Sequence, residues 1–198
     1  MKRSIQIEIT EKEILKFENI SGISWKVKGK YSQLFLADLI VFNRLFGVGS
    51  DEIFMILNDY EKGINHAGIK SPSAFKHHPL KGLLHIHFTS SAYISQNIKL
   101  GLGKKGLRQI INETLNEEHL SFEQQSAEIA KRMVDETLIK RRTDKKMTGE
   151  WVVYTKYQGE NYYLCLARHE DNDQFIRNRI EDYCLKEFPF LESILSNS

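Results

Sequence analysis

Histidines are concentrated in one short stretch of this 198-residue chain. Four of the seven lie between residues 75 and 106, and they are His77, His78, His85 and His87. Histidine is the side chain that titrates closest to neutral pH, and it is also the commonest metal ligand in proteins. The stretch therefore points to three kinds of chemistry, which are acid–base catalysis, phosphate binding and metal binding.

Residues 82–89 show the two-residue alternation of a β-strand. Because residues two apart in a strand share a face, His85 and His87 are expected to point the same way. The opposite side carries apolar residues, which are Leu84, Ile86 and Phe88. The predicted strand would thus present two imidazoles together on one side and pack on the other.

A metal site is one interpretation of these histidines. A His-x-His pair on a strand can bind one metal ion, and His77 or His78 would add a third ligand. The stretch contains no Asp or Glu, however, and Lys76 and Lys81 would repel a cation. We therefore predict no metal and no cofactor, and a metal-dependent hydrolase is the least favoured function. A second interpretation is that the histidines only line a sheet and have a structural role.

Acid–base chemistry fits the charges of this stretch better. Metal-independent RNA cleavage needs a base for the 2′-hydroxyl proton, an acid for the leaving oxygen and cations beside the phosphate. Histidine and lysine side chains supply all three. The predicted catalytic residues are His85, His87, Lys81 and His169. His85 or His87 would act as the acid or base, Lys81 would hold phosphate, and His169 would position the nucleotide base.

A glycine-rich basic turn follows at residues 101–106, GLGKKG. Glycines there allow backbone N–H groups to approach an anion, although the spacing is not that of a P-loop. The phosphate-binding residues predicted from this turn and the next helix are Lys104, Lys105 and Arg108.

Residues 151–156 and 161–169 are predicted to form a β-hairpin around Gln158 and Gly159, with Tyr157 opposite Glu160. In that register one face carries Trp151, Val153, Thr155, Tyr162, Leu164 and Leu166. The other face gathers Tyr154, Lys156, Asn161, Tyr163 and Cys165, with His169 just beyond. We predict Tyr154, Lys156 and Tyr163 as nucleic-acid contacts, by stacking on a base or binding a phosphate. Alternatively, a helix over residues 173–186 covers this face.

Several helices are expected from periodicity and capping signals. Residues 32–46 form a strongly apolar, buried helix that ends at Gly47. Ser121 and Gln124 make a capping box that opens the longest helix, up to about residue 142. The residues predicted to face the core from this helix are Phe122, Ile129, Met133, Val134 and Leu138. Residues 4–10 alternate like a half-buried strand, and Ser50 is the predicted N-cap of a helix to about residue 62.

The composition is that of a soluble globular protein, with 41% hydrophobic and 27% charged residues and a net charge of +2. So small a net charge means that nucleic-acid binding would depend on local clusters of basic residues. Only two cysteines occur, Cys165 and Cys184, which favours reduced thiols in a cytoplasmic protein. No apolar run approaches the length of a membrane span, and no secretory signal is expected.

The composition shifts at residues 63–75, which is the predicted domain boundary. It would separate a helical region with one edge strand at residues 1–70 from an α+β functional domain at residues 71–198. A single domain over residues 1–198 is the alternative. The predicted fold class is α+β, with a helix-rich N-terminal part and a small antiparallel sheet packed by the long helix.

The C-terminal hairpin, EWVVYTKYQGENYYLCLARH, follows a run of helices and carries His, Lys and Tyr side chains. This layout resembles the ribonuclease group that includes barnase, EndoU, the colicin nucleases and RelE-type toxins. The resemblance covers at most the last 120 residues, and it implies metal-independent RNA cleavage on a twisted antiparallel sheet. The chain departs from that group after the hairpin, where it continues as a helix instead of further strands.

The sequence therefore predicts a cytoplasmic, bacterial-type ribonuclease or toxin-like nuclease that acts without metal. A non-enzymatic module is the main alternative, and it would bind nucleic acid or a partner protein such as the inhibitor of a toxin. RNA and a cognate protein are accordingly the predicted partners, and no membrane partner is expected.

Overall fold

The computed structural model describes residues 7–64, 71–103, 105–117, 119–144 and 150–196. The chain divides into two compact units, one built from residues 1–65, 71–88 and 149–198 and the other from residues 66–70 and 89–148. This division differs from the predicted boundary at residues 63–75. The reason is that strands from both sides of that boundary pair in a single sheet.

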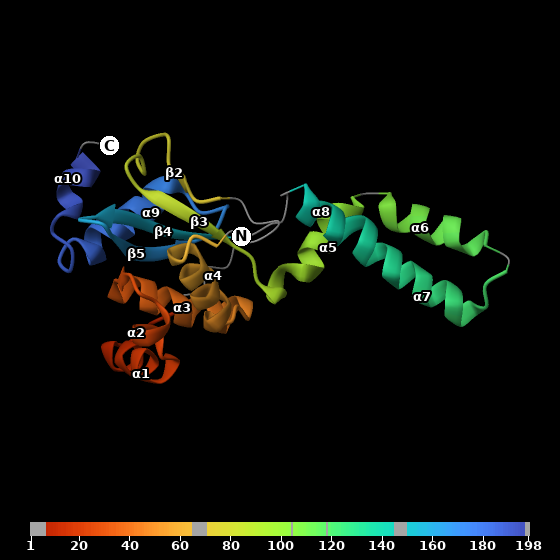
Figure 1. The fold of residues 1–198 in the computed structure, drawn as a ribbon, viewed down its shortest axis with the longest axis horizontal. Helices are drawn as coiled ribbons and strands as arrows, with labels where there is room; N and C mark the ends of the chain where they lie inside the picture. Colours follow the sequence, from red (N-terminus) through yellow and green to blue (C-terminus); the bar gives the residue numbers. More distant parts are fainter. Residues whose placement is uncertain (1–6, 65–70, 104, 118, 145–149, 197–198) are drawn as a thin grey trace. The chain divides into compact units, whose positions relative to one another are not determined.

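The first unit contains the sheet and most of the helices (Figure 1). Its elements are α1 (Glu11–Ser21), α2 (Ile23–Lys26), β1 (Lys30–Tyr31), α3 (Gln33–Phe46), α4 (Ser50–Glu61), β2 (Ser73–Ala74), β3 (Leu84–Phe88), β4 (Glu150–Tyr157), β5 (Glu160–Ala167), α9 (Asp173–Arg179), η3 (Ile180–Cys184) and α10 (Leu191–Ser196). The second unit is helical, with η1 (Ser91–Tyr93), α5 (Ile94–Leu102), α6 (Gly106–Leu115), α7 (Phe122–Met133), η2 (Val134–Ile139) and α8 (Lys140–Thr143). The α+β class is confirmed.

The five strands lie in the order β1-β5-β4-β3-β2. The short strand β1 runs parallel to β5, and the other neighbours are antiparallel, so the sheet is mixed. Strand β3 was predicted from its alternation and is confirmed, and the hairpin of β4 and β5 has Tyr157 opposite Glu160 as expected. Residues 7–10 of the predicted N-terminal strand are not in a strand, and residues 4–6 lie outside the described part of the chain.

Helices α3 and α4 cover one face of this sheet. The rings of Phe35 and Tyr163 lie 6.0 Å apart, and those of Phe42 and Phe88 lie 6.1 Å apart. The predicted buried helix is thus confirmed as α3, which Ser32 caps and which Gly47 ends in the left-handed conformation. Helix α4 begins one residue later than its cap Gly49, so Ser50 is its first residue rather than its N-cap.

The C-terminal helices pack on the other face. Val153, Cys165 and Ala167 from the hairpin form one apolar cluster with Ile176 and Ile180, all of them completely buried. The sheet is therefore packed by helices of its own unit. The long helix at residues 121–142, predicted to pack this sheet, belongs instead to the second unit.

A β-bulge interrupts the pairing of β4 with β5 between Val153 and Tyr154. Tyr154 lies opposite Tyr163, but Val153 lies opposite Cys165, so one residue of β5 is left over at this point. Beyond the bulge Trp151 faces Ala167, and the predicted grouping of Trp151 and Val153 with Leu166 is wrong. An extra residue in one strand moves all later side chains of that strand to the other face.

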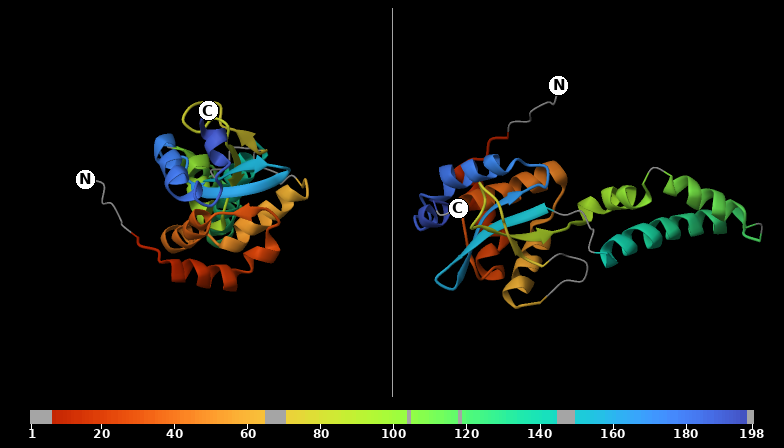
Figure 2. Two further views of the ribbon diagram at one scale, coloured as in Figure 1. Left: turned by 90° about the vertical axis from the view of Figure 1, so that its left-hand side faces the viewer. Right: turned by 90° about the horizontal axis from the view of Figure 1, so that it is seen from above.

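The second unit is built around two antiparallel helices, α6 and α7, which lie side by side (Figure 2). The predicted capping box of Ser121 and Gln124 starts α7 as expected. The predicted core stripe is wrong for Phe122 and Val134, whose exposed fractions are 78% and 40%. Two helices are too thin a layer to bury a stripe completely. None of the described helices, in either unit, combines the length and apolarity that a bilayer span requires.

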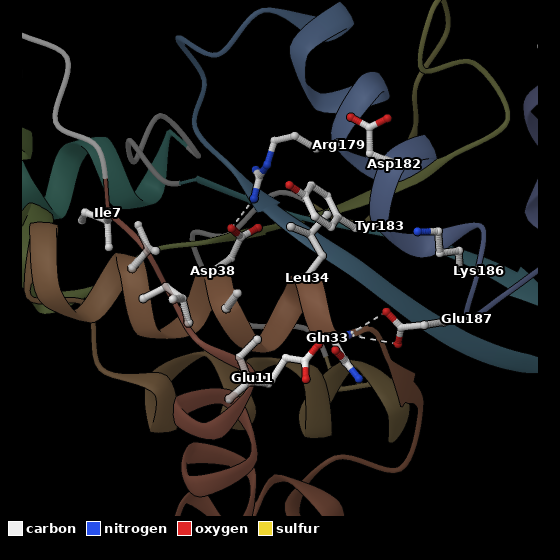
Figure 3. Close-up of a pocket in the computed structure, with 14 residues that line it drawn as sticks. Ile7, Glu11, Gln33, Leu34, Asp38, Arg179, Asp182, Tyr183, Lys186 and Glu187 are labelled. Carbon is white, nitrogen blue, oxygen red and sulfur yellow. Dashed lines mark hydrogen bonds and ion pairs between the residues drawn. The ribbon is translucent and has the colours of Figure 1, made fainter.

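A buried ion pair binds the edge of β5 in the part of the strand that extends beyond its pairing with β1. Asp38 of α3 accepts a hydrogen bond of 2.9 Å from the backbone N–H of Leu166 and pairs with Arg179 of α9 (Figure 3). Arg179 also donates to the carbonyl oxygen of Leu166 at 3.4 Å. The side chain of Asp38 thus takes the place of a neighbouring strand.

We expect Asp38→Ala to lower the free energy of unfolding by about 3–5 kcal/mol, because Arg179 and the Leu166 N–H would lose their partner in the interior. Both tryptophans lie in the first unit, so their fluorescence during urea unfolding reports on it. Asp51→Ala is the control, since the side chain of Asp51 is 80% exposed in its pair with Lys26. Equal losses in the two variants would contradict a structural role for the buried pair.

Candidate functional site

His85 and His87 lie side by side on β3, as the sequence predicts. Their ring centroids are 5.0 Å apart, and both side chains are half-buried. Across the sheet His85 pairs with Val153 and His87 pairs with Trp151, so the two imidazoles share the face of those residues. The opposite side of β3 carries the buried residues Ile86 and Phe88.

His169 joins this pair from the end of the hairpin. Its ring stacks on that of His87 with centroids 5.4 Å apart, and it lies 4.5 Å from the ring of Trp151. Beyond the β-bulge, Cys165 and Ala167 of β5 lie on the face of Val153 and Trp151, and His169 follows in the turn after the strand. Three of the four predicted catalytic residues are therefore brought together. We call His85, His87 and His169 the histidine cluster.

Aromatic side chains surround the histidine cluster. The ring of Phe75 lies 4.6 Å from that of His85 and 5.5 Å from that of Trp151. His85 also contacts Trp151, with ring centroids 5.3 Å apart. On the side of β2, Nε2 of His85 and Oγ of Ser73 form a hydrogen bond of 3.1 Å. The cluster is thus held by packing and by a polar contact from two neighbouring strands.

Glu150 contacts the backbone of the histidine cluster, and sequence reasoning did not single it out. Its Oε2 accepts a hydrogen bond of 2.7 Å from the backbone N–H of His169. Burial raises the pKa of Glu150 to about 7, and this outweighs the lowering effects of the His169 hydrogen bond and of Arg168. A carboxyl group whose pKa lies near neutrality can both accept and donate a proton at physiological pH.

Of the predicted cations, Lys81 lies in the same unit as the histidine cluster but is not part of it. Lys81 is exposed in the turn before β3 and makes no hydrogen bond or ion pair with another described residue. His77 and His78 are exposed in the same loop. Lys105 and Arg108 belong to the second unit, and Lys104 lies outside the described residues.

The prediction that Tyr154 and Tyr163 stack on a base is wrong, because both side chains are buried. Tyr154 and Tyr163 are 1% and 0% exposed, and they lie on the opposite face of the sheet from the histidine cluster. Tyr154 shares a hydrogen bond of 2.6 Å with Tyr60, and Tyr163 donates one of 2.8 Å to Glu61. Neither ring is open to a base, because α4 covers both.

Lys156 is exposed on the same face as Tyr154, and its Nζ lies 5.6 Å from the ring centroid of Tyr60. It too is directed away from the histidine cluster. The two cysteines, Cys165 and Cys184, are buried and form no disulfide. Burial raises the pKa of Cys184 to about 12 and that of Cys165 well above its ordinary value, so neither supplies a thiolate.

Within the described ranges, no group of three or more His, Cys, Asp or Glu side chains is arranged to hold a metal ion. A groove of about 630 Å³ lies elsewhere in the first unit, between α3 and η3, with the Asp38–Arg179 pair in its wall (Figure 3). None of the predicted site residues lines this groove. Asp38 and Arg179 bind the backbone of β5 there, and the histidine cluster remains the candidate site.

Comparison with known proteins finds no matching family model, no similar curated protein and no similar solved structure. The functional argument therefore depends on the residues themselves. Sequence spacing found His85 and His87 because both lie on one strand. Glu150 and Trp151 had no local signal as site residues, and only the pairing of β4 with β3 and β5 brings them there.

The raised pKa of Glu150 predicts how stability depends on pH. The folded protein binds the Glu150 proton more tightly than the unfolded chain, whose ordinary value is 4.5. The resulting stabilisation is complete below pH 4.5 and is lost as the pH rises through about 7. We therefore expect Glu150→Gln, which cannot ionise, to be less sensitive to pH than the wild type over this range.

Urea unfolding followed by tryptophan fluorescence at a series of pH values measures the effect. The variant Glu160→Gln, at an exposed position at the other end of the hairpin, serves as the control and should follow the wild-type profile. Parallel profiles for Glu150→Gln and the wild type would show that Glu150 does not titrate as its burial implies.

Proposed function

We propose that this chain cleaves RNA without a metal ion, with the histidine cluster supplying the acid and the base. The single observation that supports the proposal is the meeting of His85, His87 and His169, which come from two separate parts of the sequence. Two imidazoles of different protonation state are the simplest means of moving both protons in this reaction at neutral pH.

In the proposed reaction one imidazole takes the proton of the ribose 2′-hydroxyl, and the resulting alkoxide attacks the adjacent phosphorus. A second imidazole gives its proton to the 5′-oxygen as the bond from that oxygen to phosphorus breaks. The products are a 2′,3′-cyclic phosphate and a 5′-hydroxyl. His87 lies between His85 and His169, at 5.0 and 5.4 Å from them, so it can work with either one.

Glu150 and the aromatic residues support this assignment. Glu150 holds the backbone of His169 in place through the hydrogen bond from its N–H group. Trp151 and Phe75 offer aromatic surface beside the histidines, and such surface commonly stacks on the bases of single-stranded RNA. Single-stranded RNA is accordingly the proposed substrate.

The test is incubation of the purified full-length chain with single-stranded RNA in the presence of a chelator. We expect cleavage products that end in 2′,3′-cyclic phosphate. Replacing His85 and His87 together by Ala should lower the rate at least about 100-fold, because both proton transfers are affected. His169→Ala should lower the cleavage rate as well. The variant Lys81→Ala tests a different point, the phosphate contact predicted from the sequence.

His77→Ala is the matched control, since His77 is an exposed histidine in the loop before β3 and lies outside the cluster. It should cleave at the wild-type rate. Circular dichroism of every variant separates lost chemistry from lost folding. Absence of cleavage by the wild type, or a rate that the double variant leaves unchanged, would refute the proposal. RNA binding without cleavage would favour the alternative, a nucleic-acid-binding module.

A further inference from the structure

The hairpin of α6 and α7 in the second unit has one polar side. Arg132 of α7 forms ion pairs with Glu113 of α6 and with Glu136, and it donates a hydrogen bond to Thr114 at 3.4 Å. Gln109 of α6 adds a hydrogen bond of 2.8 Å to Glu113. The contacts of Arg132 with Glu113 and Thr114 tie the two helices together along that side.

The other side of the hairpin is apolar and open. On α6 the residues Leu107, Ile111 and Leu115 are four apart, so they form one stripe. Leu107 and Leu115 are 43% and 53% exposed. On α7 the matching stripe contains Phe122 and Met133, and Phe122 is 78% exposed.

Two features at opposite ends of this apolar side complement each other. Near the start of α6 there is a groove of about 510 Å³, which is lined by residues that include Ile98, Lys99, Leu102, Leu107 and Met133. Near the start of α7, at the other end of the hairpin, stands the exposed ring of Phe122. Glu123 follows Phe122 directly, and its pKa is lowered, by a backbone contact and a hydrogen bond from Ser121, so it is charged.

We propose that this side of the hairpin binds the same side of a second copy of the chain, in antiparallel orientation. A two-fold axis near the middle of α7 would place Phe122 of each copy in the groove of the other. The same rotation would bring Glu123 of one copy to Lys99 of the other. The interface is isologous, which is the arrangement of most protein dimers.

The dimensions and the residue types agree with this orientation. Phe122 and Met133 are eleven residues apart on one helix, or about 16 Å and about three turns, so both lie on the same side of α7 at its two ends. Between them the same side of α7 carries the small exposed residues Ser126 and Ala130, which allow two helices to approach closely.

The charges also select a second copy over other occupants. The groove is lined by apolar side chains and by Lys99, so it favours an apolar side chain next to an acidic one, and Phe122 and Glu123 are such a pair in the sequence. Helices of 10 and 12 residues offer a small interface, below the roughly 800 Å² per partner of a standard complex. The dimer is therefore expected to form in the micromolar range or weaker.

Sedimentation equilibrium of the full-length chain, from micromolar to millimolar concentration, tests the proposal. The wild type should show a reversible monomer–dimer equilibrium. Phe122→Glu should raise the dissociation constant more than about tenfold, as expected for loss of an aromatic side chain that fills a groove. Because Phe122 is an exposed residue in the first turn of α7, this variant keeps the helix and its dipole interaction.

Leu100→Glu is the matched control, because Leu100 is an exposed apolar residue of α5 that does not line the groove, and it should dimerise like the wild type. Charge reversal gives a second, independent measurement. Glu123→Lys and Lys99→Glu should each weaken the dimer, and the two changes together should restore it.

Three results would overturn the proposal. They are a wild type that stays monomeric at every concentration, a dimer that Phe122→Glu leaves unchanged, and single charge reversals that the double variant does not rescue. A monomeric wild type would indicate that the apolar side of the hairpin binds a different protein. A dimer sensitive to Leu100→Glu instead of Phe122→Glu would place the interface elsewhere.

Discussion

The candidate site depends on a single irregularity in backbone pairing, the β-bulge between β4 and β5. Regular pairing continued from Tyr157 and Glu160 would place Leu166 opposite Trp151, whereas the structure places Ala167 there. One additional residue thus reverses the direction of every later side chain in β5. Ala167 thus lies on the face of Trp151, and His169, in the turn two residues later, meets His87 and Trp151, with ring centroids 5.4 and 4.5 Å away.

The bulge is held in place by contacts from the other edge of β5. The hydroxyl group of Ser32 donates a hydrogen bond of 2.6 Å to the carbonyl oxygen of Leu164, the residue that the bulge leaves over. Two residues later Asp38 accepts from the N–H of Leu166, and Arg179 pairs with Asp38. Helices from both faces of the sheet therefore fix the backbone just before it reaches His169. The buried Asp38–Arg179 pair and the histidine cluster are thus linked through the backbone of β5.

Local sequence signals predicted local structure well. The caps of α3 and α7 and the alternation of β3 are properties of neighbouring residues, and all three are confirmed. The pattern of residue types in the hairpin sequence does not reveal the bulge, so the face of His169 could not be predicted. The burial of Tyr154 and Tyr163 depends on Tyr60 and Glu61, which are about a hundred positions away in the sequence. The insertion of a helical unit between two adjacent strands, β3 and β4, could not be predicted from composition either.

The proposed chemistry therefore rests on the proximity of imidazoles from distant parts of the chain. Nuclear Overhauser spectroscopy of the protein in solution, with labelled histidine and tryptophan, measures that proximity directly. Cross-peaks are predicted between the ring protons of His169 and those of both His87 and Trp151, whose centroids lie 5.4 and 4.5 Å away. Cross-peaks from His169 to Val152 on the opposite face, with none to His87 or Trp151, would show a hairpin without the bulge and would contradict the account.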